Sequence, residues 1–187
     1  ASLMKGSRFR TIGIGPKKGK RIKVECPTTY FTTIIFKNRS IIRLTLSFDV
    51  IAHQRNHIEL YGNKGSIIVP DPNMFGGSAF VSVTAGGNWG EHKTDMMPLG
   101  KINIKSQSSR ANESPTNANY RGAGLSEMAY AIENNLEHRC NGELSLHVLD
   151  IIDSTMRASQ TGIPQEIKTT CKKPKPFTLE EIKKIMN

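Results

Sequence analysis

The sequence lacks the features that mark disulfide-rich, zinc-binding and membrane-spanning proteins. Its three cysteines, Cys26, Cys140 and Cys171, lie far apart and form no Cys-x-x-Cys pair. This is the pattern of free thiols in a reducing compartment. No apolar run approaches the roughly 20 residues that are needed to cross a membrane, and the first residues do not have the pattern of a secretory leader. We therefore expect a soluble, cytoplasmic protein without membrane contact.

Motifs that carry catalysis or hold a cofactor are also missing. We find no nucleophile with an adjacent base, no paired carboxylates and no metal-ligand spacing among the five histidines. The glycines of residues 13–19 (GIGPKKG) lead into a strand pattern, which predicts a turn and not a phosphate-binding loop. Asp49 and His53 have the spacing of a helical acid–base pair but follow a strand, where four residues span about 13 Å. We expect no catalytic residue, no cofactor-binding residue and no metal ligand in this chain.

Acidic residues are absent before Glu25, although the chain as a whole carries a net charge of +10. Eight of the first 23 residues are Lys or Arg, and a second basic cluster lies at 172–175. Such a charge raises nucleic acid as a partner. The basic blocks, however, lack the interleaved aromatic residues that stack on bases. This favours solvated ends of a domain, and we do not expect nucleic acid as a partner.

Six strand patterns follow one another in the first half of the chain: RIKVE, TYFTTIIF, SIIRLTLSF, HIELY, GSIIV and SAFVSVT. The connections at 37–39 and 62–65 are short, which predicts antiparallel hairpins. One face of SIIRLTLSF is wholly apolar (Ile42, Leu44, Leu46 and Phe48) and is expected to be covered by helices. In TYFTTIIF both faces carry apolar residues, which fits either contact with a second copy or a sheet face with scattered apolar residues.

Two helices in tandem are predicted between Tyr120 and Gly162. The first should bury the stripe Leu125, Met128, Ala129, Ile132 and Leu136; the second should bury Leu144, Val148, Leu149, Ile151, Ile152, Thr155, Met156 and Ser159. The helix dipole explains the acidic Glu127 near the first helix start. EIKTT at 166–170 predicts a returning strand, and Thr178 with Glu181 predicts a capping box that opens a short helix.

These patterns predict an α+β fold with an open-faced, mostly antiparallel β-sheet and two main helices packed on one face. We expect residues 1–187 to form a single domain, with 1–7 a tag or frayed end and 171–187 a connector and C-terminal helix. The region around Trp89 has no clear pattern. Residues 106–119 predict a mobile loop that either covers a binding cleft or has no role.

Several motifs together resemble a known family. They are TIGIGPKKGKRIKVECPTT, SFDV, HIELYGNKGSIIVPDPNMFGG, YRGAGLSEMAYAIE and HRCNGELSLHVLDIIDSTMRASQTG. In this order they resemble the C-terminal domain of the glucose–fructose oxidoreductase and inositol dehydrogenase superfamily, over residues 8 to 170. Members of that family are NAD(P)-dependent dehydrogenases of sugars, inositols and related polyols. Their N-terminal Rossmann domain is followed by an open-faced sheet with helices on one side, which often forms oligomers through the other side.

The resemblance implies a chain that is not catalytically complete by itself. The family's glycine-rich loop, its Glu-Lys-Pro lysine and its Asp/His segment would all precede Ala1. The residues before Met4 are typical of a cloning remnant, so the chain is either an isolated domain or the product of a split gene. The expected partners are the missing Rossmann domain, a second copy bound through the sheet face and a small-molecule substrate. NAD or NADP would bind to the intact enzyme and not to this chain.

Three residues are implied to line the substrate cleft: Tyr120, Arg121 and Gly124. Sugar-acting branches of the family often have a tyrosine three residues before the helix glutamate, where this chain has Gly124 before Glu127. Two alternatives stay open. In the first, the chain is a stand-alone basic module that binds nucleic acid or another anionic partner. In the second, it is a purely structural assembly domain.

Overall fold

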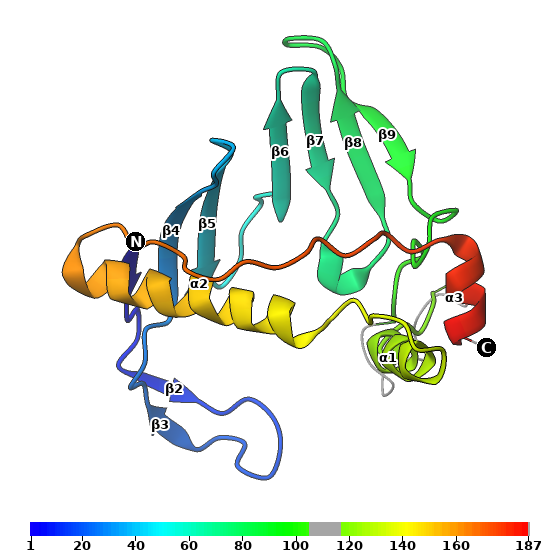
Figure 1. Cartoon of the computed structure of the whole chain (residues 1–187). Helices are drawn as coiled ribbons and strands as arrows, with labels where there is room; N and C mark the ends of the chain where they lie inside the picture. Colours follow the sequence, from blue (N-terminus) through cyan, green and yellow to red (C-terminus); the bar gives the residue numbers. More distant parts are fainter. Residues whose placement is uncertain (105–116, 187) are drawn as a thin grey trace. The chain divides into compact units, whose positions relative to one another are not determined.

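The computed structural model describes residues 1–104 and 117–186 and confirms the α+β class (Figure 1). Every strand pairing within its sheets is antiparallel, and the sheets are open. The strands form three sheets, with the orders β1-β4-β5, β2-β3 and β6-β7-β8-β9, and not the single sheet that the sequence predicts. Most of the loop predicted at 106–119 lies outside the described residues.

The chain divides into two compact units. The first unit combines Ala1–His53 with Gly142–Lys172, and the second unit combines Gln54–Asn141 with Lys173–Asn187. The two helices that follow each other in the sequence therefore belong to different units. That the chain folds as a single domain stays a prediction.

The first unit contains a three-stranded sheet, a two-stranded ribbon and one long helix. Its elements are β1 (Ser2–Met4), β2 (Phe9–Thr11), β3 (Arg21–Lys23), β4 (Thr29–Ile35), β5 (Ile41–Ser47) and α2 (Gly142–Thr161). β4 and β5 form the predicted hairpin. Residues 2–4, expected to be frayed, pair with β4 as an edge strand, and α2 packs against this strand. This pairing cannot be predicted from the sequence, because three residues are too few to show an alternating pattern.

The apolar face of β5 is only partly covered. Leu44 is half-buried, as are its neighbours Thr32 and Ile34 on β4. Leu46 and Phe48 are exposed, and Phe48 retains 81% of its accessible surface. The prediction that helices cover this whole face is therefore wrong within the part of the chain that the structure describes. The physical reason is that α2 packs on β1, which is separated from β5 by β4.

Helix α2 ends in the predicted way at Gly162, but the segment after it is not a strand. The carboxylate of Asp150 accepts hydrogen bonds from the backbone N–H groups of Lys168 and Thr169, both at 3.0 Å, and from the Thr169 hydroxyl at 2.9 Å. These bonds, first those from Thr169, hold the pKa of Asp150 below its usual value. The predicted strand at 166–170 is absent from the described structure because a helix side chain accepts the N–H donors that a strand partner would otherwise accept.

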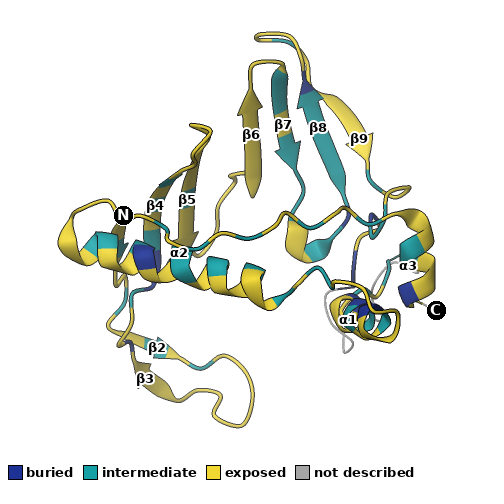
Figure 2. Ribbon diagram, in the orientation of Figure 1, coloured by how far each residue is buried: buried dark blue, intermediate teal, exposed yellow. Residues whose placement is uncertain are grey.

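The second unit contains a four-stranded antiparallel meander. Its strands are β6 (Ile58–Gly62), β7 (Gly65–Val69), β8 (Ser78–Ser82) and β9 (Gly90–Lys93), and the 3-10 helix η1 (Pro72–Met74) lies between β7 and β8. The central strands β7 and β8 are mostly half-buried, whereas the edge strands β6 and β9 are exposed (Figure 2). β9 follows Trp89 directly, in the region where the sequence shows no clear pattern.

Two helices of the second unit pack against each other: α1 (Ala123–Glu133) and α3 (Leu179–Met186). The capping box at the start of α3 is confirmed, because the Glu181 N–H donates to Thr178 Oγ1 at 3.2 Å and the Thr178 N–H donates to Glu181 Oε2 at 2.7 Å. In α1 the buried residues are Ala123, Glu127 and Ala131. The stripe predicted to be buried is largely exposed, as at Leu125, Ala129, Ile132 and Leu136.

Candidate functional site

The residues predicted to line the substrate cleft lie in the second unit, at the N-terminal end of α1. Tyr120 and Arg121 precede the helix, and Gly124 is its second residue. The Tyr120 carbonyl accepts a hydrogen bond from the Ala123 N–H at 2.9 Å, which starts the turn that enters the helix. The position of the first two residues is therefore fixed by the helix start and not by an irregular loop.

The side chain of Asn103 holds this turn in place. Its side chain is completely buried, and its Oδ1 accepts the Tyr120 N–H at 2.7 Å. The Asn103 N–H donates to the Met74 carbonyl at 2.9 Å, so one residue joins the turn to η1. Asn103 Nδ2 has no hydrogen-bond partner among the described residues. A buried amide without a partner is costly, so the position of Asn103 is maintained by the bonds of its Oδ1 and its backbone N–H.

The loop before β8 gives the turn an aromatic contact. The rings of Phe75 and Tyr120 lie 5.2 Å apart between centroids, with an interplanar angle of 51°. This is a tilted pairing of the kind that aromatic side chains favour. The loop itself is tightly held, because a Cβ at Gly76 would lie 2.0 Å from the Gly100 carbonyl oxygen. Phe75 is thus a rigid support for the tyrosine.

Arg121 is the one charged residue among the three predicted site residues, and it is exposed. Its Nη1 donates to Asn73 Oδ1 at 3.2 Å. Asn73 is itself fixed, since its N–H donates to Asp71 Oδ1 at 2.9 Å. The exposed guanidinium is therefore oriented by an amide, and an arginine has further N–H donors beyond this one bond. Such a group can bind the oxygen atoms of a hydroxylated or anionic ligand.

Gly124 stands apart from these contacts. A Cβ built on it meets no atom within 4 Å, so the helix surface around it is open. The structure brings Tyr120 and Arg121 together with Asn73, Phe75 and Asn103, and leaves Gly124 on a free face of α1. This arrangement offers hydrogen-bond donors and an aromatic ring. It can bind a polar ligand, and the described residues around it include no paired nucleophile and base.

Arg139 is the centre of a second cluster in this unit, which sequence reasoning missed. Its guanidinium donates to Glu127 Oε1 at 3.0 Å, to Glu181 Oε1 at 2.9 Å and to the Lys175 carbonyl at 2.8 Å. It also lies 3.9 Å from the centroid of the Phe177 ring. Glu127 is therefore an inward-facing ion-pair partner, and not merely a residue favoured by the helix dipole.

The charges of this cluster stabilise one another. Burial opposes the charge of Arg139, but hydrogen bonds to Glu181 and Glu127 outweigh it and raise the pKa of the arginine. The Thr178 N–H and Arg139 together lower the pKa of Glu181 to about 2. The capping box was the only sequence signal for this cluster, and it identified Glu181 alone.

Asp49 forms a third polar cluster, in the first unit. Its carboxylate accepts hydrogen bonds from the hydroxyls of Thr28 at 2.6 Å and Thr29 at 2.7 Å, and from Arg10 at 3.1 Å. These donors, the two hydroxyls first, lower the pKa of Asp49. A carboxylate that is held ionised in this way is a poor proton acceptor. Asp49 therefore joins three segments of the first unit, and its lack of a catalytic role stays a prediction.

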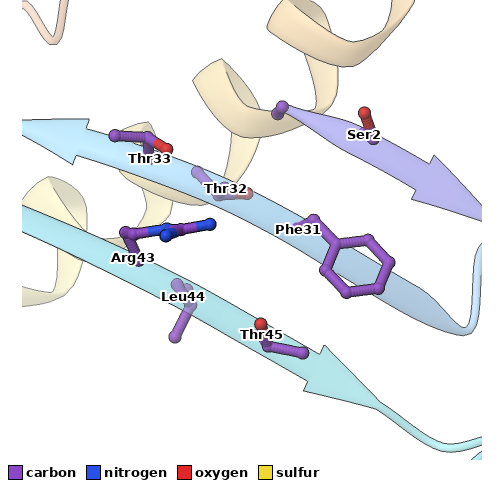
Figure 3. A pocket seen from close by; sticks show the side chains of 8 residues that line it. Ser2, Phe31, Thr32, Thr33, Arg43, Leu44 and Thr45 are labelled. Atoms are coloured by element: carbon purple, nitrogen blue, oxygen red, sulfur yellow. The ribbon is translucent and has the colours of Figure 1, made fainter. Parts of the chain in front are cut away.

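A shallow hollow of about 240 Å³ lies on the sheet of the first unit (Figure 3). Phe31 and Thr45 form one cross-strand pair in its lining, and Thr33 and Arg43 form the next. By strand alternation these four side chains share one face of the sheet. The lining includes one cationic side chain, Arg43, as well as the first residue, Ala1, and it includes none of the residues predicted to bind substrate.

Searches for other kinds of site gave no candidate. Residues 1–104 and 117–186 contain no group of His, Cys, Asp and Glu side chains that could hold a metal ion. Within the same ranges, no helix has the length and apolar character needed to cross a membrane. No protein-family profile matches the chain, and no curated protein or solved structure is significantly similar to it.

Proposed function

We propose that this chain is the substrate-side and oligomerisation domain of an NAD(P)-dependent oxidoreductase that acts on sugars, inositols or related polyols. The observation that carries the proposal is the set of contacts around Tyr120 and Arg121. The oriented guanidinium and the supported ring form a surface that suits a ligand rich in hydroxyl groups, and the buried Asn103 amide holds the turn that carries them. The ordered resemblance of residues 8–170 to that family's C-terminal domain supports the same function.

The proposed oligomer uses the outer face of the three-stranded sheet. Phe31, Ile35 and Ile41 are all exposed there, and Ile35 retains 71% of its accessible surface. Register places them on the same face, because Phe31 and Ile35 are four residues apart on β4 and Ile35 pairs with Ile41. Neighbouring exposed apolar side chains on one sheet face are typical of a surface that meets a second copy.

The site is tested first by NMR titration of the isotope-labelled chain with myo-inositol and with glucose. We expect the amide signals of residues 120–124 to shift with one of these ligands, and Arg121→Met to weaken that binding because it removes the oriented donors. Arg39→Met is the matched control, since Arg39 is an exposed arginine in a turn of the first unit. If residues 120–124 show no shift with any sugar or polyol, the proposed substrate site is wrong.

Calorimetry tests the proposal that NAD or NADP binds to a separate domain and not to this chain. We expect neither NAD nor NADP to bind this chain tightly, and tight stoichiometric binding would contradict the proposal. The reading frame directly upstream of Met4 gives an independent test, because the proposal requires it, or another gene, to encode a Rossmann domain.

A purely structural assembly domain is the second candidate, and the exposed apolar face favours it equally. The two functions differ in the titration, because an assembly domain would oligomerise without binding polyols. Light scattering at high protein concentration tests the assembly role, which the two candidate functions share. A monomer at every concentration would remove the assembly role from both.

A further inference from the structure

The two-stranded ribbon of the first unit carries a dense positive charge. We use the term basic ribbon for residues 8–24, which comprise β2, β3 and the loop between them. Phe9 pairs with Lys23, Arg10 with Ile22 and Thr11 with Arg21. In Figure 1 the ribbon extends away from the three-stranded sheet of the same unit. It contains seven Lys and Arg residues and no acid: Arg8, Arg10, Lys17, Lys18, Lys20, Arg21 and Lys23.

The two faces of the basic ribbon differ. On one face Val24 is buried, and Arg10 donates to Asp49 and to the Phe48 carbonyl, so this face is attached to the rest of the unit. On the other face lie Phe9, Thr11, Arg21 and Lys23, all of them exposed. The cations of the second face are therefore available to a partner.

Phe9 gives this exposed face an aromatic surface. The guanidinium carbon of Arg21 lies 4.2 Å from the centroid of the Phe9 ring, and the phenylalanine still retains 46% of its accessible surface. The basic ribbon therefore does have an aromatic residue next to its cations, contrary to what the sequence pattern indicates. The two residues are twelve positions apart, and only the strand register brings them together.

The loop of the basic ribbon presents further cations in a defined conformation. The N–H of Gly19 donates to the Ile12 carbonyl at 2.8 Å, and the Ile12 N–H donates to the Lys20 carbonyl at 3.0 Å. Gly15 and Gly19 have φ values of 81° and 84°, which glycine adopts without strain. Lys17, Lys18 and Lys20 are exposed, and no described carboxylate lies within ion-pair distance of them. The nearest ion pair along this face is the weak, exposed Lys23–Glu25 contact at 3.7 Å.

We propose that the basic ribbon binds single-stranded nucleic acid, with the loop lysines on the phosphates and a base stacked on the Phe9–Arg21 pair. A positive surface that follows the backbone, together with an aromatic ring for stacking, is the usual means of binding single strands without sequence preference. An anionic membrane fits less well, because Ile14 is the only large apolar side chain of the loop that is strongly exposed. The proposal concerns the first unit and does not rest on the polyol site of the second unit.

Fluorescence anisotropy with a labelled 20-nucleotide oligothymidylate and the full chain tests how much the positive charges contribute to binding. If the four exposed lysines of the loop and outer face (Lys17, Lys18, Lys20 and Lys23) contact phosphates while Arg21 stays in the stacking pair, the logarithm of the affinity should fall with the logarithm of salt with a slope of about −2.8. We expect the double variant Lys17→Glu, Lys18→Glu to bind at least about tenfold more weakly at 50 mM salt. The control is Lys37→Glu, Lys64→Glu, which changes the net charge equally at two exposed hairpin turns and should cost less than about threefold.

The stacking contribution is tested at Phe9. Phe9→Leu keeps an apolar side chain but removes the ring, and we expect a loss of about fivefold or more. Phe9→Trp should retain or improve binding, which separates stacking from a general effect on the fold; circular dichroism of both variants checks the fold itself.

Four results would overturn the proposal. They are no binding of the wild-type chain at 50 mM salt, equal losses in the two lysine double variants, equal affinity for a duplex of the same length, and binding to phosphatidylserine vesicles without binding to the oligonucleotide.

Discussion

Two arginines tie together distant segments of the chain, and they do so in different ways. In the second unit Arg139 is itself the centre, with two carboxylates, one carbonyl and one ring around it. In the first unit the centre is the carboxylate of Asp49, and Arg10 is only one of its three side-chain donors. We therefore expect the residue at the centre, and not the presence of an ion pair, to decide how much each cluster contributes to stability.

The largest expected effect comes from removing the centre of the second cluster. Arg139→Ala removes the cation from Glu127, whose side chain is only 7% exposed, and leaves this buried carboxylate with the backbone N–H of residue 139, at 3.1 and 3.3 Å from its two oxygens. Breaking a pair in this way costs about 3 kcal/mol or more in the free energy of unfolding. Arg10→Ala should cost less than about 1 kcal/mol, because the two threonine hydroxyls remain on the carboxylate and the arginine is partly exposed.

Urea unfolding measures both variants. The single tryptophan, Trp89, belongs to the second unit, so its fluorescence follows that unit, while circular dichroism follows both. Equal destabilisation by Arg139→Ala and Arg10→Ala would show that the two clusters do not differ in the way that their geometry indicates.

The next largest effect is expected at Gly6, which lies against the carboxylate of Asp49. A Cβ on Gly6 would lie 2.3 Å from Asp49 Cγ. Because the carboxylate is fixed by Thr28 and Thr29, it cannot move away without losing hydrogen bonds. We expect Gly6→Ala to cost about 1–3 kcal/mol in the free energy of unfolding, measured by circular dichroism. Gly13→Ala is the control, since its Cβ would meet no atom within 4 Å. If the two variants are equally stable, Asp49 is more mobile than its contacts indicate.

The strands could be predicted from the sequence, but the contacts of these two clusters could not. Alternation placed all six strands predicted in the first half of the chain and both hairpins, because an apolar period of two is a local signal. It failed for the seventh predicted strand, at 166–170. The partners of Arg139 lie 12 and 42 residues away along the chain, and no local pattern connects them. The same ion pair explains the error in α1. The apolar period pointed to the stripe of Leu125 and Ile132, whereas the buried face is the one that carries Glu127.

The candidate site was predictable only in part. The resemblance selected Tyr120 and Arg121, but it gave no indication of Asn103, which is fully buried and holds the turn. Neither did it predict that Phe75 supports the tyrosine ring. These contacts join segments that are far apart in the sequence, and their side chains have no periodic pattern from which they could have been found.

The third prediction concerns acid stability and applies to the second unit. The folded-state pKa of Glu181 is about 2, below its usual value of 4.5. A lowered pKa contributes stability that is fully present above pH 4.5 and is lost as the pH falls toward 2. Since the side chain is 40% exposed, solvent screening reduces this contribution to about 1 kcal/mol. Unfolding monitored at Trp89 between pH 6 and pH 2.5 should show the loss, and Glu181→Gln should reduce it. An unchanged pH dependence in the variant would assign the loss to other carboxylates.

The smallest effect is expected at Gly124, an exposed residue in the first turn of α1. Gly124→Ala adds a methyl group into open space and removes the flexibility of glycine in a helix, so we expect a gain of about 0.5–1 kcal/mol. Ala129→Gly, at an exposed position of the same helix, should cost about 1 kcal/mol. A loss of stability in Gly124→Ala would mean that this face of α1 is covered.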